Sequence, residues 1–206
     1  YYDFTRVDTD RYLIDGEYRQ VMLAPRELAI EQLQNRTWVN ERLQYTHGYG
    51  IVISPVNRMT PEGLPELWVY DIPPKSKVGA DLAVVRPEIY FGEQTNHYVF
   101  VQTKVPEFDY PQGDQNAEAS YQGSGGVPMG TLARRLLFAM RFQDSKIIWS
   151  QSFTKDSRVM YYRNIHDRVR RIAPFLRYDK EPYMVVSNGR LFWMLDAYTF
   201  SDRYPY

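Results

Sequence analysis

Short apolar runs separated by turn signals dominate the chain. The first runs flank Asp15 and Gly16, and the last flank Asn188 and Gly189. Both dipeptides favour the positive φ angles that a two-residue type I′ turn requires. We therefore predict a β-hairpin near each end, over residues 10–23 and 182–200.

Four further apolar runs in the middle of the chain predict strands. IVISPV at 51–56 and LWVYDI at 67–72 are rich in β-branched and aromatic residues, and we expect these two strands to pair. RPEIYFGE at 86–93 and HYVFVQT at 97–103 predict two more. Residues 106–126 are rich in Gly, Pro, Asp and Gln without periodicity, which predicts a long surface loop.

Three segments show helical spacing of their apolar residues. Pro25 opens a predicted helix over 25–33, because proline is tolerated in a first turn. Residues 128–142 place Leu132, Leu136, Ala139 and Met140 on one helix face and predict a second helix. Residues 158–173, with Ser157 as the expected N-cap, predict a third, with Tyr161, Ile165, Val169 and Ile172 as its buried stripe. Residues 146–153 fit either a strand or a helical turn.

These elements together predict an α+β fold, mainly antiparallel sheet with about three flanking helices. The length of 206 residues suits a single domain over 1–206. Since the chain begins at Tyr1 without an initiator Met, we expect it to be an excised piece of a longer protein. Its apolar runs are shorter than the roughly 20 residues of a membrane-spanning helix, so we expect the piece itself to be soluble.

The charge balance and the absence of cysteine exclude several function classes. Twenty-five basic residues match twenty-five acidic ones, so the net charge predicts no nucleic-acid partner. Without cysteine there is no disulfide, thiol nucleophile or thiolate metal site. The three histidines have no zinc-binding spacing, so we predict no metal and no cofactor.

His47 is the main catalytic candidate. It lies in the motif Tyr45 to Gly50, where two glycines let the backbone approach a ligand closely. A general base would need an orienting carboxylate, and Asp71 is the first candidate. Glu62, Glu107 and Asp109 are the others. The competing interpretation is a histidine that is hydrogen-bonded within a tight turn.

A glycine-rich loop before the second predicted helix is the main binding candidate. Free N–H groups, the helix dipole and two guanidinium groups would suit a phosphate or carboxylate. The loop is not a P-loop, because a threonine stands where the phosphate-binding lysine belongs. The competing interpretation is a flexible loop and helix cap. The predicted binding residues are Gly123, Gly125, Gly126, Thr131, Arg134 and Arg135.

Other charged segments have weaker functional interpretations. Glu107, Asp109, Asp114 and Glu118 could offer oxygen ligands to Ca²⁺, although solvated loop charges explain them as well. A carboxylate pair for glycoside hydrolysis depends on a spatial separation that sequence does not reveal. The basic run over 155–177 could meet anionic lipid or an acidic partner, or form a solvated face. No GxSxG motif supports a serine hydrolase.

Several long strings give the chain a family resemblance. They are NRTWVNERLQYTHGYGIVISPVNRMTPEGLP at 35–65, RPEIYFGE at 86–93, EFDYPQGD at 107–114, the helix with Arg134 and Arg135, RNIHDRVRRIAPFL at 163–176 and DAYTFSDRYPY at 196–206. On these strings the chain resembles uncharacterised protein family 0182, large bacterial membrane proteins.

The resemblance implies a longer protein whose N-terminal part crosses the membrane several times. It places this piece in a soluble region on the extracytoplasmic side, and it implies no reaction. We therefore expect a non-enzymatic ligand-binding or interaction domain of the cell envelope. The expected partners are the rest of the same membrane protein and an anionic lipid or envelope ligand. The alternative is a cell-envelope hydrolase or transferase that uses His47 with carboxylates.

Overall fold

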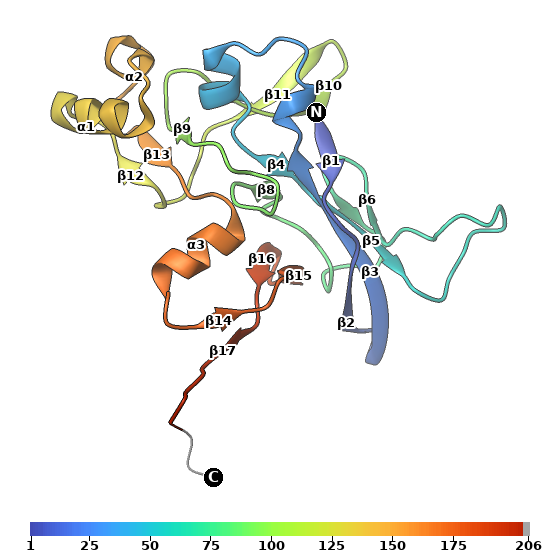
Figure 1. Cartoon of the computed structure of the whole chain (residues 1–206). Helices are drawn as coiled ribbons and strands as arrows, with labels where there is room; N and C mark the ends of the chain where they lie inside the picture. The colour runs from blue at the N-terminus through green and yellow to red at the C-terminus, as the bar shows by residue number, and fades with distance from the viewer. Residues whose placement is uncertain (204–206) are drawn as a thin grey trace. The chain divides into compact units, whose positions relative to one another are not determined.

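The computed structural model describes residues 1–203 and contains two compact units (Figure 1). The sheet unit comprises Tyr2–Ala29, Gly48–Thr95 and the segment from Asn164 onward. The helical unit comprises Tyr1, Ile30–His47 and Asn96–Arg163. The predicted single domain over 1–206 stays a prediction, because two such units can still fold as one domain. The end of the string DAYTFSDRYPY, residues 204–206, lies outside the described residues.

The sheet unit is built around one long strand, β3. Its main sheet runs in the order β1, β3, β5, β6, β7, and β2 also pairs with β3. Every pairing in this sheet is antiparallel. The strands are β1 Tyr2–Phe4, β2 Asp8–Ile14, β3 Glu17–Leu28, β5 Ile51–Pro55, β6 Val69–Tyr70 and β7 Lys75–Ser76.

Smaller strand pairs and one helix complete the sheet unit. β4 pairs with β8, β14 with β17 and β15 with β16, all antiparallel. Figure 1 shows the helix α3 leading into β14. The bounds are β4 Gly48–Tyr49, β8 Glu88–Ile89, α3 Ile165–Ile172, β14 Arg177–Tyr178, β15 Tyr183–Ser187, β16 Arg190–Met194 and β17 Ala197–Tyr198.

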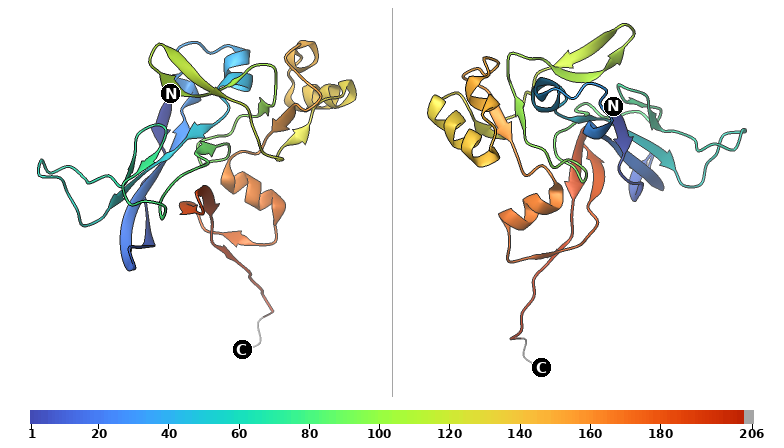
Figure 2. Two further views of the ribbon diagram at one scale, coloured as in Figure 1. Left: turned by 180° about the vertical axis from the view of Figure 1, so that it is seen from behind. Right: turned by 45° about the horizontal axis from the view of Figure 1, so that its top comes forward.

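The helical unit combines short helices with a small sheet and a hairpin. Its sheet runs in the order β12, β13, β9, and β10 pairs with β11. Both views in Figure 2 show α1 and α2 side by side. The bounds are η1 Ile30–Gln32 (3₁₀), η2 Asn40–Gln44 (π), β9 Val99–Val101, β10 Glu107–Gln112, β11 Gln115–Ala119, β12 Val127–Pro128, α1 Leu132–Phe142, α2 Lys146–Trp149 and β13 Arg158–Met160.

Each unit has its own hydrophobic core. Buried residues of the sheet unit form one cluster: Ile14, Val21, Leu23, Ile51, Ile53, Trp68, Val69, Leu82, Ile89, Met184 and Val186. Buried residues of the helical unit form the other: Leu43, Phe100, Met129, Ala139, Ile147, Phe153 and Val159. Within residues 1–203, no helix combines the length and the apolar character needed to cross a membrane.

The structure confirms the α+β class and the predicted pairings. Asp15 and Gly16 take positive φ angles between β2 and β3, and Asn188 and Gly189 do so between β15 and β16. β5 and β6 pair as expected, with Ile53 opposite a valine of β6. The sheets are smaller and more divided than a single antiparallel sheet would be.

The helix predicted over 25–33 is wrong. β3 continues through Leu28, and only the 3₁₀ turn η1 follows. All residues from Leu23 to Leu28 are buried, so neither face of this segment is exposed to solvent. Helical spacing and a buried strand look alike over so few residues. Pro25 pairs with Ile51 of β5, so this segment is part of a strand.

The helix predicted over 158–173 is only half right. Residues 158–160 form β13, and the chain takes a positive φ at Tyr162 before α3 begins. Ser157 caps no helix, since its hydroxyl accepts from the Thr154 N–H at 2.7 Å and contacts the Gln102 carbonyl. The N-cap of α3 is Asn164, which accepts from the Asp167 N–H.

The structure also corrects the loop predicted over 106–126 and shows which element the ambiguous segment over 146–153 forms. Residues 106–126 are not a plain loop, because β10 and β11 form a hairpin that turns at Gly113, whose φ is 61°. Residues 146–149 form the helical turn α2, which settles the ambiguity in that segment. The helix predicted over 128–142 is confirmed as α1, beginning at Leu132 after the N-cap Thr131.

A buried carboxylate ties β3 to the loop that follows β8. Glu27 is 1% exposed, and it accepts hydrogen bonds from the Glu93 N–H at 2.7 Å and the Gln94 N–H at 3.1 Å. The hydroxyls of Thr95 and Thr5 also donate to it. Gly92 leaves the space for this carboxylate, since a Cβ there would lie 2.1 Å from its Oε2.

We expect Glu27→Ala to lower the free energy of unfolding by about 3 kcal/mol, because buried donors would lose their charged acceptor. Chemical denaturation followed by circular dichroism measures this change. Glu31→Ala removes an exposed carboxylate of η1 and is the control, with an expected change within about 0.5 kcal/mol. Equal effects of the two substitutions would contradict the role of Glu27.

Candidate functional site

His47 lies inside a cluster of polar residues in the helical unit. Thr46 and His47 are both fully buried at the end of the segment that contains η2. The His47 Nε2 lies 3.0 Å from the Asp109 Oδ1, and its Nδ1 lies 2.9 Å from the Thr46 Oγ1. Thr46 also donates its hydroxyl to the Glu107 Oε2 at 2.6 Å. Both carboxylates belong to β10.

The hydrogen bonds determine the protonation state of His47. Thr46 has one hydroxyl proton and gives it to Glu107, so its oxygen must accept from the Nδ1–H of His47. Asp109 is a carboxylate that can only accept, so Nε2 also carries a proton. With both nitrogens protonated, His47 is an imidazolium ion between two acids.

The pKa directions agree with this assignment. Burial by itself lowers the pKa of His47, but the hydrogen bonds to Asp109 and Glu107 outweigh it, and the net pKa is raised. Burial raises the pKa of Glu107, but the hydrogen bonds from His47 and Thr46 outweigh it, and the net pKa is lowered. Both shifts favour the charged form of the group, the imidazolium of His47 and the carboxylate of Glu107.

This geometry favours the structural interpretation of His47 over the catalytic one. A general base needs a reacting group within hydrogen-bond reach, whereas both ring nitrogens face protein atoms and the side chain is 0% exposed. Asp71, the first candidate partner, lies in the sheet unit and pairs with the Lys75 Nζ at 2.9 Å. Glu62 is exposed.

Arg163 adds a second buried cation to the helical unit. Its side chain is fully buried, and it donates to the backbone carbonyls of Thr46 and His97. The unit thus buries two cationic groups, His47 and Arg163, with the carboxylate of Glu107, which balances one of the two charges. The sequence contained no signal for the role of Arg163, because its partners are carbonyl groups.

The glycine-rich loop encloses a cation of the same chain. The Arg158 guanidinium donates to the carbonyls of Ser124, Gly125 and Gly126, at 2.6 to 3.0 Å. The Gly125 N–H donates to the Tyr121 hydroxyl. Carbonyl oxygens, not N–H groups, therefore converge in this part of the loop, which is the wrong polarity for an anion.

The arginines predicted to bind with this loop have different environments. Thr131 is the N-cap of α1 and accepts from the Arg134 N–H. Arg134 is exposed, whereas the Arg135 guanidinium lies 4.8 Å from the Phe153 ring centroid. Arg134 thus reaches solvent, and its guanidinium also donates to the Pro128 carbonyl at 3.4 Å. An anion site at this loop stays a prediction.

The remaining charged candidates are dispersed. Asp114 and Glu118 are exposed, away from the buried carboxylate of Glu107. Within the basic run, Arg168 lies over the Phe91 ring and Arg177 over the Phe200 ring, each at 4.3 Å. Both guanidinium groups therefore pack on aromatic rings of the same chain. Contact of the run with anionic lipid or an acidic partner stays a prediction.

The most unusual surface of the helical unit is on α1 and α2. Leu132, Leu136 and Met140 follow one another four residues apart, and so share one helix face. They are 63%, 43% and 77% exposed, and Trp149 of α2 is 78% exposed. Leu137 extends the same surface. We call these five side chains the α1–α2 apolar face.

The packing of α1 explains why this face stays outside. Phe138 and Phe142 pack against the core through Tyr98 and Tyr161, and the Phe142 and Tyr98 rings stack at 4.1 Å. The aromatic side of the helix is therefore buried and the aliphatic side is not. The sequence pattern showed the amphipathic stripe but not which apolar side would be covered.

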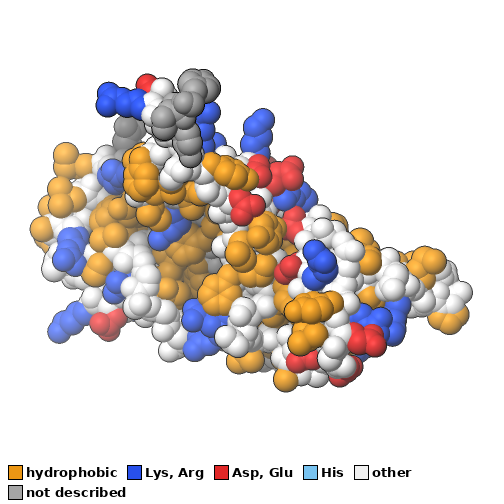
Figure 3. Space-filling view, turned by 90° about the horizontal axis from the view of Figure 1, so that it is seen from below, with side chains coloured by type: hydrophobic (Ala, Val, Ile, Leu, Met, Phe, Trp, Pro, Cys, Tyr) orange, Lys and Arg blue, Asp and Glu red, His pale blue; other side chains and the backbone are white. Residues whose placement is uncertain are grey.

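Basic side chains border the α1–α2 apolar face. Arg134, Arg141 and Lys146 are exposed, and residues 131–149 contain a single acid, Asp144. Its carboxylate accepts from the Trp38 Nε1 at 2.6 Å and from the Tyr98 hydroxyl. Figure 3 shows one face of the molecule, where apolar side chains gather beside basic ones and most acidic ones lie in the right half of the view.

A hollow of about 380 Å³ adjoins this region, lined by Leu137, Phe138, Arg141 and Tyr161. Three of its four residues are apolar or aromatic, and the fourth is an arginine that also lies 5.3 Å from the Tyr161 ring centroid. An apolar group could enter beside a cation here. This combination can accept an amphiphile with a negative head group.

Comparison with known proteins gives one family over the whole chain. The profile of the uncharacterised protein family UPF0182 matches residues 1–206. Similar UPF0182 proteins occur in Geotalea uraniireducens, at 56% identity over 207 residues, and in Pelotomaculum thermopropionicum, at 53% over 208 residues. One from Geobacter sulfurreducens is 52% identical over 207 residues. Each alignment covers the full chain here and 22% or 23% of the relative. No solved structure matches the fold.

The His47 cluster predicts a decline of stability on the alkaline side. A raised histidine pKa contributes stability that is complete below the ordinary value of 6.5 and is lost as pH rises through the folded pKa. The lowered pKa of Glu107 adds stability that is complete above 4.5 and is lost as pH falls.

We expect His47→Gln to be about 3 kcal/mol less stable than wild type near pH 6 and to lose most of the alkaline decline in stability. Denaturant unfolding of wild type and variant, from pH 6 into the alkaline range, measures the difference in stability and the alkaline decline.

His97→Gln is the matched control. Burial and the nearby Arg42 lower the pKa of His97, so this residue is neutral in both folded and unfolded states at alkaline pH. Its replacement should leave the alkaline decline unchanged. If His47→Gln retained the wild-type decline, the imidazolium assignment would be wrong.

Proposed function

The chain belongs to the uncharacterised protein family UPF0182, and on that premise we propose that it is a non-enzymatic interaction domain of a longer membrane protein. It would work on the extracytoplasmic side and rest on anionic lipid through the α1–α2 apolar face. The chain spans about 23% of the length of the relatives that it matches. The rest of the same protein is the other partner that we propose.

The exposure of the α1–α2 apolar face carries this proposal. Single exposed apolar side chains are normal on a protein surface, but here five large ones lie in one area of the unit, on two helices that pack against each other. Such areas mark surfaces that bind another molecule. Leu137 and Met140, each more than 60% exposed, would lose the most contact with water on binding.

The charges around the face support an anionic lipid as the occupant. A helix that lies on a membrane combines an apolar side with bordering Lys and Arg, and tryptophan is favoured at the interface. Arg134, Arg141 and Lys146 supply the cations, and Trp149 supplies the aromatic ring. Each cation near an anionic surface contributes about 1 kcal/mol. The hollow beside Arg141 gives one acyl chain or glycerol group a place to enter.

Co-sedimentation of the 206-residue chain with vesicles tests this proposal. We expect binding to vesicles that contain phosphatidylglycerol and much weaker binding to pure phosphatidylcholine. Arg134→Ala combined with Lys146→Ala should weaken binding about 30-fold, since two contributions of about 1 kcal/mol are lost. Arg135 is kept, because its guanidinium packs on Phe153.

A second pair of variants separates apolar insertion from charge attraction. Leu137→Glu with Met140→Glu should abolish vesicle binding. Met59→Glu with Leu64→Glu alters two equally exposed apolar residues of the sheet unit and should leave binding intact. Unchanged binding in the first pair, or equal loss in both pairs, would refute the proposed face.

A further inference from the structure

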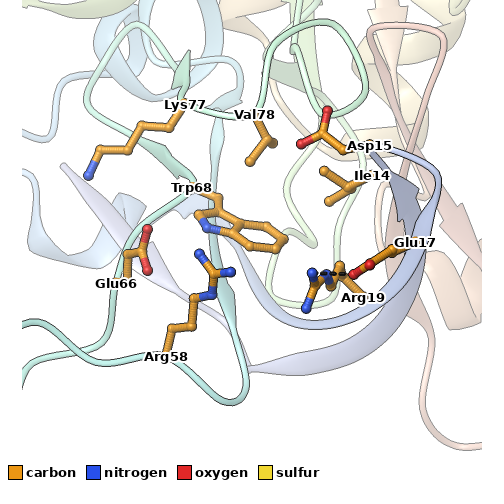
Figure 4. Close-up of a pocket in the computed structure, with 9 residues that line it drawn as sticks. All are labelled: Ile14, Asp15, Glu17, Arg19, Arg58, Glu66, Trp68, Lys77 and Val78. Carbon is orange, nitrogen blue, oxygen red and sulfur yellow. Dashed lines mark ion pairs between the residues drawn. The ribbon is translucent and has the colours of Figure 1, made fainter.

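The sheet unit contains a ligand-sized cavity that the proposed lipid contact does not use. It has a volume of about 390 Å³, within the range of about 300 to 1,000 Å³ typical of small-molecule sites. It lies where the β2–β3 turn meets the β5–β6 connection and the end of β7 (Figure 4). All its lining residues belong to the sheet unit.

The floor of the cavity is apolar and rigid. Ile14 and Trp68 are 4% and 5% exposed, and both belong to the core of the sheet unit, against which Val78 packs. Figure 4 shows the indole in the middle of the cavity, with Ile14 and Val78 beside it. Since so little of the indole is exposed, a ligand would meet an edge and not a full ring face.

Two residues of opposite charge, Arg58 and Glu66, lie beside this floor. They belong to the two arms of the β5–β6 connection, the segment that leaves β5 and the segment that returns to β6. The Glu66 N–H donates to the Arg58 carbonyl at 3.3 Å, and a bridge between Met59 and Pro65 closes the arms beyond them. Arg58 and Glu66 therefore stand opposite each other. Despite this, no ion pair or side-chain hydrogen bond joins either of them to another residue within 1–203. Figure 4 shows both charged ends beside the indole.

The other charges of the cavity are already used or lie at its border. Arg19 forms an ion pair with Glu17. The Lys77 Nζ lies 5.2 Å from the Tyr70 ring centroid, and in Figure 4 its ammonium points away from the indole. Asp15 lies in the β2–β3 turn, on the Ile14 side of the cavity. Arg58 and Glu66 are thus the two opposite charges that lie beside the indole.

From this arrangement we propose that the cavity binds a small zwitterion with an aliphatic body, of the α-amino acid class. Arg58 would hold the carboxylate through its forked N–H groups, Glu66 would accept from the ammonium group, and the side chain would rest on Ile14, Trp68 and Val78. A simple anion would leave Glu66 as an unfavourable neighbour. A sugar would need the open aromatic face that Trp68 does not offer.

Isothermal titration calorimetry of the 206-residue chain with L-leucine tests this site. We expect saturable binding by L-leucine. Leucinamide, which lacks the carboxylate, N-acetyl-leucine, which lacks the ammonium group, and glycine, which lacks the aliphatic body, should each bind at least about tenfold more weakly.

Arg58→Gln and Glu66→Gln should each reduce L-leucine affinity by at least about tenfold. The Arg58 side chain is exposed and forms no ion pair or side-chain hydrogen bond within residues 1–203, so its replacement breaks no such interaction of the fold. Arg11→Gln, at an exposed arginine of β2 outside the cavity, is the control.

Absence of binding by L-leucine, or equal binding in wild type and Arg58→Gln, would overturn the proposal. Equal binding by glucose would overturn it in favour of a sugar site. Vesicle binding should be unaffected by Arg58→Gln, so this site and the lipid face can fail independently.

Discussion

The sheet unit depends on the pairing of β3 with three other strands. β2 pairs with its first half, β1 with its end, and β5 along its other edge. An antiparallel ladder satisfies the backbone polar groups of a segment that is buried on both faces, as residues 23–28 are. The same strand carries Arg19 to the cavity at one end and Glu27 to the buried loop contact at the other. Features at both ends thus depend on one ladder.

Sequence alone could predict what local chemistry decides. The turn dipeptides at Asp15 and Asn188 specified their hairpins, and the stripe of Leu132 to Met140 specified α1. It could not predict outcomes that distant partners decide. Leu23 to Leu28 became a strand because of β1 and β5, and residues 158–160 became one because of β9 and β12. The candidate sites show the same division. His47 was visible as a motif, whereas its partners on β10 and the position of Arg58 opposite Glu66 were not.

The helical unit buries charged side chains and exposes large apolar ones, the reverse of the usual distribution in a globular domain. Fully buried ions such as His47, Glu107 and Arg163 are held by hydrogen bonds and neighbouring charges. Large apolar side chains of α1 and α2 meanwhile remain in water. Paired ions inside contribute fixed geometry, and uncovered apolar side chains outside contribute free energy to binding.

The chain passes between the two units several times. It crosses after Tyr1, Ala29, His47, Thr95 and Arg163, so each unit is assembled from three separate pieces of sequence. Neither unit can therefore be cut out as one continuous segment, and a single proteolytic nick releases neither of them. Each unit also closes loops that contain parts of the other, which gives both a high contact order and slows their folding. A truncation or circular permutation of this chain therefore alters both units, because each unit is built from separate segments of the sequence.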